Sequence, residues 1–332
     1  MKRKDRIHKK YSSQKSIRKA SEDLAEKEVH KPKASTSFYH THYKEILIIP
    51  FAILLIAIIF IILNFNSTGE IVNRGISLKG GTSIQIPTTT YSATELNQKL
   101  SASFPEKEIV VRELEETGRQ IGLTIESNIL PSEEAETDAL RLEISQLTGI
   151  SKKDMSIQGI DPTLGEKFFK QTLIAILIAF TFMGLVVFFY FKTFVPSAAV
   201  ILSAFSDIVV TLAIVNLLNI QIGTAGIAAF LMLIGYSVDT DILLTTRVVK
   251  NREGTVYERT INAMKTGLTM TFTTFAAVLV AYIVSDSDVL KEIMLIIIIG
   301  LLIDLINTWL QNAGILRYYM EKREQKELTQ NE

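Results

Sequence analysis

The sequence predicts an α-helical multi-pass membrane protein, a six-helix bundle with one small soluble α+β domain inserted after the first helix. Three observations support this fold class. Of the 332 residues, 48% are hydrophobic, and they are gathered into long stretches. A helix needs about 20 apolar residues to cross roughly 30 Å of hydrocarbon, and six stretches qualify. Between the first two stretches, the pattern changes to that of a soluble domain.

The six predicted spans follow one another with short links, except after the first. That first span is not a cleavable signal peptide, because it is too long and begins only after 45 residues. The spans are expected at Ile46–Phe65, Gln171–Phe191, Phe194–Leu218, Ile222–Leu244, Thr266–Val284 and Val289–Leu310.

The soluble domain is expected at residues 66–166, in the order β-α-β-β-α-β of the ferredoxin-like arrangement. Thr82–Ile86 alternates at period two, which predicts the first strand. Ser92 and Glu95 form the pattern of a capping box and begin a helix to about Ser103. The later elements are strands at Ile109–Leu114 and Gln120–Glu126, a helix from Pro131 to about Thr148, and a strand at Met155–Ile160.

The distribution of Lys and Arg predicts the orientation of the chain in the membrane. Residues 1–45 carry 13 basic and 6 acidic residues, and the loop 247–265 has a net charge of +3. Basic flanking segments stay in the cytoplasm. We therefore expect a multi-pass protein of the cytoplasmic membrane with both termini in the cytoplasm, residues 66–166 outside and residues 167–312 forming spans two to six.

The two ends of the chain are predicted to be tails. The polar, charged composition of residues 1–45 is typical of a disordered segment. Its basic residues either bind anionic membrane lipid or only set the topology. Residues 313–332 mix charges of both signs, which is typical of a solvated cytoplasmic end.

Composition excludes several classes of function. The 35 basic and 35 acidic residues balance, which argues against a nucleic-acid partner. Cysteine is absent, and all four histidines lie in the first 42 residues. No metal or cofactor is therefore expected in the spans, and no nucleophile–base pair appears. The chain is not expected to be an enzyme.

Four aspartates in the predicted spans are the candidate functional residues. Asp207 lies in the middle of the third span, Asp239 and Asp241 in the fourth, and Asp304 in the sixth. An ionised carboxylate in hydrocarbon is costly unless it faces a polar interior. Asp239 and Asp241 differ by about 200° around a helix, so both cannot face the same neighbour.

Two interpretations of these acids remain open. In the first, they form a polar seam that binds and passes protons or another cation, with Thr271 and Thr274 of the fifth span as further candidates. In the second, the carboxyls cap helix ends or pair with nearby basic residues, and the hydroxyls bond across helices. The sequence alone does not choose between them.

Five short segments carry motifs that follow one another in order along the predicted spans, at residues 75–82, 161–165, 206–208, 235–239 and 271–274. Together they resemble the SecD/SecF family of protein-export membrane proteins, and within it SecF of the archaeal type. Residues 75–82 resemble its G-h-D-h-x-G-G-T signature, with Ser77 in place of Asp, and residues 161–165 resemble its G-P-x-h-G stretch. Residues 206–208, 235–239 and 271–274 resemble its motifs in spans three to five. The signature residues are Gly75, Gly80, Gly81, Pro162, Gly165, Gly235, Tyr236 and Ser237.

The resemblance implies half of a transporter of the resistance-nodulation-division layout. It implies an accessory subunit of the Sec translocase that, with SecD and beside the Sec protein-conducting channel, promotes preprotein export with the help of an ion (proton) gradient. Two alternatives are a small-molecule or lipid exporter of the same layout and a purely structural assembly partner of SecD. Thr266 stands near the position of an arginine in bacterial relatives, and Thr240 stands at their acidic position.

Overall fold

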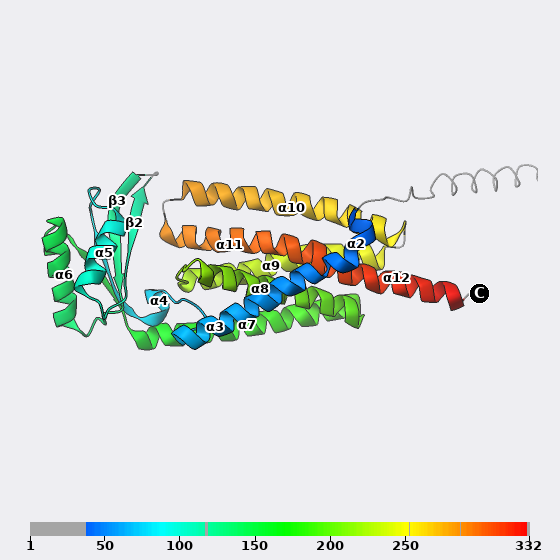
Figure 1. Cartoon of the computed structure of the whole chain (residues 1–332), viewed down its shortest axis with the longest axis horizontal. Coiled ribbons are helices and arrows are strands. Elements are labelled where there is room, and N and C mark those ends of the chain that lie inside the picture. The colour runs from blue at the N-terminus through cyan, green and yellow to red at the C-terminus, as the bar shows by residue number, and fades with distance from the viewer. Residues whose placement is uncertain (1–37, 117–118, 252, 286, 331–332) are drawn as a thin grey trace, which may run out of the picture. The chain divides into compact units, whose positions relative to one another are not determined.

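The computed structural model describes residues 38–116, 119–251, 253–285 and 287–330 (Figure 1). The chain divides into two units, the first ending at Tyr43 and the second beginning at Lys44. The second unit contains the soluble domain and the helical bundle. Most of the predicted tail lies outside the described residues, but Phe38–Ile46 forms helix α2. Helical structure therefore begins before the predicted start of the first span.

Among the described residues, five helical stretches are long and apolar enough to cross a membrane. This makes the chain a multi-pass membrane protein. A sixth helix, α11 (Asp288–Ile306), stands where the sixth span is predicted, but it is not among the five and carries Lys291, Glu292 and Asp304. The five stretches contain α3 (Ile48–Thr68), α7 (Pro162–Phe191), α8 (Phe194–Leu217), α9 (Thr224–Thr245) and α10 (Val256–Val284).

Helices α7 and α10 both begin about ten residues before the predicted spans, because local capping signals extend them into the polar flanks. The Asp161 carboxylate accepts a hydrogen bond from the Thr163 backbone N–H at 2.7 Å, and Pro162 occupies the first helical position. Hydrogen bonds from the Thr163 side chain and backbone hold the pKa of Asp161 below its usual value. Thr255 and Glu258 form a complete capping box at the start of α10.

Helices α8 and α9 form the centre of the bundle. In the most apolar stretch of each of these two helices, 56% of the residues are buried. The corresponding share is 17% in the stretches that contain α3 and α10 and 6% in α7. Helices α3 and α7 instead present large apolar side chains such as Leu55 and Leu177 to their surroundings. Several polar residues of α8 and α9, among them Asp207 and Asp241, are therefore surrounded by protein.

The soluble domain runs β1-α5-β2-β3-α6-β4, the order that the sequence patterns predicted, with the antiparallel sheet order β2-β3-β1-β4. Ile84 of β1 pairs with Ile125 of β3 and Ile157 of β4. Helices α5 and α6 cover one sheet face through Leu100 and Ile144. Figure 1 shows α6 on the side of the sheet away from the bundle. The bounds are β1 Gly81–Ile86, α5 Ala93–Ser103, β2 Ile109–Glu116, β3 Arg119–Ser127, α6 Glu134–Thr148 and β4 Ser156–Ile160.

The sequence patterns do not predict the short helix α4 (Ile76–Lys79), which precedes β1 in the chain and packs against α7. Gly80 has a φ of +84°, and a Cβ there would lie 2.5 Å from the Pro162 Cα. A Cβ on Gly165 would lie 2.7 Å from the Leu78 carbonyl oxygen. Both contacts require glycine, so α4 and α7 approach each other at backbone distance.

The segment before α4 is also held by the loop between α8 and α9. The Ile222 N–H donates to the Asn73 carbonyl at 2.7 Å, and the Gly75 N–H donates to the Ile222 carbonyl at 2.9 Å. Asn216, near the end of α8, accepts from the Asn73 N–H at 3.1 Å and donates to the Ile71 carbonyl at 2.8 Å. The soluble domain is thus bound to the two central helices through main-chain groups.

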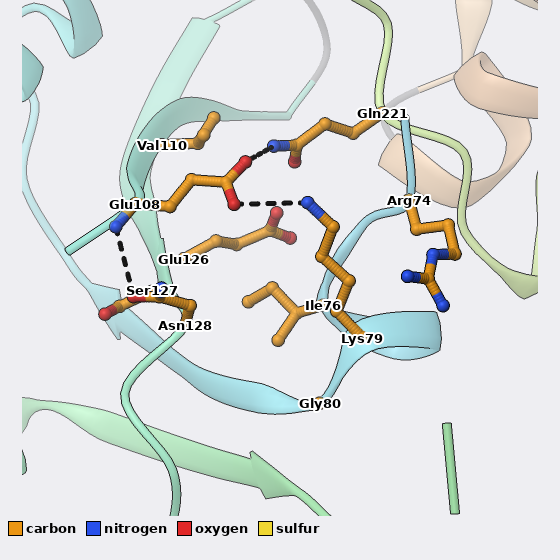
Figure 2. Close-up of a pocket in the computed structure, with 10 residues that line it drawn as sticks. All are labelled: Arg74, Ile76, Lys79, Gly80, Glu108, Val110, Glu126, Ser127, Asn128 and Gln221. Carbon is orange, nitrogen blue, oxygen red and sulfur yellow. Dashed lines mark hydrogen bonds and ion pairs between the residues drawn. The ribbon is translucent and has the colours of Figure 1, made fainter. Parts of the chain in front are cut away.

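Charged and polar side chains complete this junction around a small cavity (Figure 2). The Lys79 ammonium lies 3.2 Å from a Glu108 carboxylate oxygen and 3.5 Å from a Glu70 carboxylate oxygen. The Gln221 amide donates to Glu108 at 3.3 Å and accepts from Arg112 at 3.0 Å. Gln221 belongs to the loop between α8 and α9, so these contacts also tie strand β2 to the bundle.

Candidate ion-binding site

Asp207 of α8 lies in the interior of the bundle, with only 1% of its surface exposed. Its carboxylate accepts a hydrogen bond from the Ser237 hydroxyl of α9 at 2.5 Å. It accepts a second from the Asn307 side-chain amide at 2.8 Å. Asp207 therefore joins three segments that are far apart in the sequence.

Asp241 of α9 is fully buried. One of its carboxylate oxygens accepts from the Asn312 amide at 2.7 Å and from the Thr308 hydroxyl at 3.0 Å. Both donors belong to η3 (Asn307–Asn312), a π-helical turn that continues α11. A π-turn places residues five apart on one face, so Asn307 and Asn312 both point toward the central helices.

Asp304 of α11 is 1% exposed and lies beside the same hydroxyl. The Thr308 oxygen is 3.0 Å from a carboxylate oxygen of Asp304 and 3.0 Å from one of Asp241. A hydroxyl has one proton to donate. The Thr308 hydroxyl can therefore donate to only one of two ionised carboxylates at a time. If one of the two acids is protonated, that acid donates to the Thr308 oxygen while the hydroxyl donates to the other acid. The geometry therefore suits two acids that hold one proton between them.

The donors to the three carboxyls include the adjacent residues Asn307 and Thr308, so the three acids gather around one turn of η3. In the described part of the chain, their hydrogen-bond donors are hydroxyls and amides, and no Lys or Arg forms an ion pair with them. Burying ionised carboxylates without a countercharge is costly in free energy. A bound proton would lower that cost, so the arrangement is chemically suited to holding one.

The structure separates Asp239 from the other three acids. Its side chain is exposed on the outer surface of α9, whereas Asp241, two residues later, is buried. Thr271 is buried on the bundle side of α10, and Thr274 is half-buried. Among the hydrogen bonds between described residues, none joins either threonine to the three carboxyls.

The signature residues fall into two groups. One group lies at the junction of α4, β1 and α7: Gly75, Gly80, Gly81, Pro162 and Gly165. Ser77, in the same segment, accepts a hydrogen bond from the Thr224 N–H at 3.2 Å and so helps to hold the start of α9. The other group lies on α9, where Gly235 and Tyr236 are exposed and Ser237 donates to Asp207.

Sequence reasoning did not identify Thr308 and Asn312 as partners of the acids. A signal was present, because Asp304, Asn307, Thr308 and Asn312 recur at helical spacing at the end of an otherwise apolar segment. A polar stripe of this kind on a membrane helix faces protein rather than lipid. Its contact with Asp241 could not be read from the sequence, because that depends on how α11 packs.

Fold and site together define a multi-pass membrane protein with a soluble domain after its first helix and buried acids at its centre. A family model described as "Protein export membrane protein SecD/SecF, C-terminal" matches residues 142–322. The chain is 38% identical over 293 residues to the protein-export membrane protein SecF of Pyrococcus furiosus, covering 86% of this chain and 93% of that protein. It is also 38% identical to SecF of Methanocaldococcus jannaschii, covering 86% and 99%.

Solved structures agree on the fold. The crystal structure of SecDF, a translocon-associated membrane protein from Thermus thermophilus, matches with a TM-score of 0.66 at 19% identity, over 86% of this chain and 39% of that longer chain. SecDF in its super-membrane-facing form matches with a TM-score of 0.57 at 22% identity, over 85% and 39%. The chain belongs to the SecF family of protein-export membrane proteins and is of the archaeal type.

Proposed function

We infer that this chain is an accessory subunit of the Sec translocase that works with SecD in protein export. The similarity to SecF proteins over almost their whole length supports this function. The match to part of a longer SecDF chain supports pairing with a second membrane subunit, because this chain corresponds to 39% of that chain. The Sec protein-conducting channel and the preprotein are the further partners that this role implies.

We further propose six spans, with α11 and η3 as the sixth, and both termini in the cytoplasm. Helix α11 supports the sixth span, since its end continues into η3 and its buried residues Ile296 and Leu301 pack against α8 and α9. The soluble domain then lies outside the cytoplasm. Its order of elements supports a ferredoxin-like fold.

The proposed coupling site is the group of buried acids Asp207, Asp241 and Asp304, which binds a proton drawn from the gradient. The observation that carries this proposal is the Thr308 hydroxyl at 3.0 Å from both Asp241 and Asp304. Loading or release of one proton changes which acid accepts from Thr308, and the two acids lie on different helices. Such a change would alter the packing of α9 against α11.

Asp239 has a different proposed place. An exposed carboxylate in the fourth span faces either lipid or a partner, and lipid is the costlier surrounding. We therefore expect Asp239 at the contact with SecD.

The test is proton-gradient-dependent export in membranes that contain SecD. Asp207→Asn and Asp241→Asn keep the size of the side chain and remove its ability to bind a proton. Each variant is expected to co-purify with SecD and to lose the part of export that depends on the gradient. Normal gradient-dependent export by the double variant would contradict the coupling proposal, whereas failure of the wild-type chain to co-purify with SecD would contradict the pairing.

A further inference from the structure

A second pocket lies between the peripheral helix α7 and the central helices α8 and α9. Its volume is about 150 Å³. Phe169, Leu173 and Ile176 of α7 line one side, and Ile208, Leu212 and Phe230 of α8 and α9 line the other. This pocket lies apart from the residues that bind the three acids.

The lining is apolar. Thr172 also lines the pocket, but its hydroxyl donates to the Phe168 carbonyl at 2.8 Å and is satisfied within its own helix. A bound water needs two to four polar partners, and this lining offers none, so water is not the favoured occupant. The occupant should therefore be hydrocarbon.

The pocket is continuous with the surface of α7 that faces lipid. Leu173 lines the pocket and is nevertheless 49% exposed, and its neighbour Ile174 is 57% exposed. Helix α7 is the least buried of the five apolar helices, so most of its surface is open to its surroundings. A chain from the membrane can enter past Leu173 without first crossing a polar surface.

A cationic group stands at the rim. The Arg74 guanidinium lies 5.1 Å from the centre of the Phe169 ring, which belongs to the lining. One of its nitrogens lies 3.1 Å from a Glu70 carboxylate oxygen, and the side chain remains 25% exposed. Guanidinium has five donors in a planar fork that matches a phosphate, so donors remain for a second anion.

We propose that this pocket binds one phospholipid from the leaflet on the side of the soluble domain, with an acyl chain between α7 and the central helices and the phosphate at Arg74. Charge complementarity between phosphate and guanidinium favours this occupant over an apolar helix of a partner protein. The acyl chain would lie against Ile208, the residue after Asp207, and so would affect how tightly α7 packs against α8.

Native mass spectrometry of the full chain in detergent tests the proposal, with dioleoylphosphatidylglycerol and dioleoylglycerol as probes. Leu173→Trp fills the entrance, and Leu212→Phe fills the interior as a second variant. The matched control is Leu177→Trp, one turn further along α7 on a residue that is 67% exposed and outside the lining. Leu173→Trp is expected to bind phosphatidylglycerol about tenfold more weakly than wild type, equivalent to roughly 1.4 kcal/mol, and Leu177→Trp as tightly as wild type.

Arg74→Ala tests the headgroup contact. It is expected to weaken binding of phosphatidylglycerol about tenfold and to leave binding of dioleoylglycerol unchanged, since only the first carries a phosphate. Equal binding of phosphatidylglycerol to wild type, Leu173→Trp and Leu177→Trp would overturn the proposal. Loss of a co-purifying membrane protein from Leu173→Trp, with lipid binding intact, would overturn it as well and would assign the pocket to a partner helix.

Discussion

At the scale of single residues, the clearest contrast is between Asp239 and Asp241. The two lie on one helix, two positions apart, yet one is exposed and the other is fully buried with donors from η3. The contrast follows from helix geometry, since two residues turn the direction of the side chain by about 200°. The sequence alone predicts that the two must differ, but not which of them faces the protein.

Leucine substitutions at these two positions are expected to have different effects on stability. Asp241→Leu leaves the buried Asn312 amide without its acceptor, which should lower the free energy of unfolding by about 2 kcal/mol. Asp239→Leu should change it by less than about 0.5 kcal/mol in the isolated chain, as is usual for exposed positions. Unfolding of both variants in the same detergent checks this. Equal destabilisation would show that Asp239 is not exposed.

The Thr308 hydroxyl provides a second comparison at this scale. Thr308→Val keeps the shape of the side chain and removes the donor shared by Asp241 and Asp304. We expect it to destabilise the chain by about 1–3 kcal/mol, the cost of leaving buried polar groups unsatisfied. Thr308→Ser retains the hydroxyl and should recover most of the loss in thermal unfolding measurements. If valine and serine behave alike, the hydroxyl does not join the two acids.

At the scale of elements, two helical glycines stand in opposite surroundings. A Cβ on Gly165 would meet the Leu78 carbonyl at 2.7 Å, whereas a Cβ on Gly235 would meet no atom within 4 Å. Gly165→Ala is therefore expected to push α7 away from α4 and to destabilise the chain by about 1–3 kcal/mol, as overpacking does. Gly235→Ala should leave stability unchanged or raise it by up to about 1 kcal/mol.

Thermal unfolding of the two alanine variants, side by side, measures this difference. Limited proteolysis adds a local readout, because a displaced α4 should expose the chain between α3 and β1 to cleavage in Gly165→Ala only. Cleavage at the same rate in both variants would mean that α4 and α7 are not held together at backbone distance.

The sequence predicted the elements better than their limits. Apolar length predicts six spans, and five of them correspond to helices that are long and apolar enough to cross a membrane. Period-two alternation predicts strand β1. Apolar length places the starts of α7 and α10 too late, because it does not include the polar flanks that the capping signals Asp161-Pro162 and Thr255–Glu258 make helical. Helix α4 is a single short turn, fixed by its contacts with α7 rather than by any pattern of its own.

At the scale of the whole molecule, the candidate site depends on packing that no local pattern encodes. Hydrophobicity showed that Asp207 must be shielded, and the structure supplies Ser237 and Asn307 from two other segments as its donors. Those contacts join positions 30 and 100 residues apart in the chain. Sequence periodicity covers a few turns of one helix, so it could name the acids but not their partners.

The same scale includes the link between the soluble domain and the site. The helix that carries Asp207 ends at the loop whose Ile222 pairs with Asn73 through the main chain, and Asn216 fixes this segment by its side chain. Movement of the soluble domain relative to the bundle must therefore either carry α8 with it or break these hydrogen bonds.

Asn216→Leu removes the two side-chain hydrogen bonds of this link and places an apolar side chain of similar size at the end of α8. Because Asn216 accepts from the Asn73 N–H and donates to the Ile71 carbonyl, we expect the Asn73 amide to exchange its hydrogen about ten to a hundred times faster, consistent with roughly 1.4–2.7 kcal/mol lost from local opening. Hydrogen exchange of the full chain measures this. Asn262→Leu, on the exposed side of α10, is the matched control and should leave exchange at residues 70–79 unchanged. Unaltered protection of Asn73 in Asn216→Leu would mean that the main-chain pairing with Ile222 holds the junction by itself.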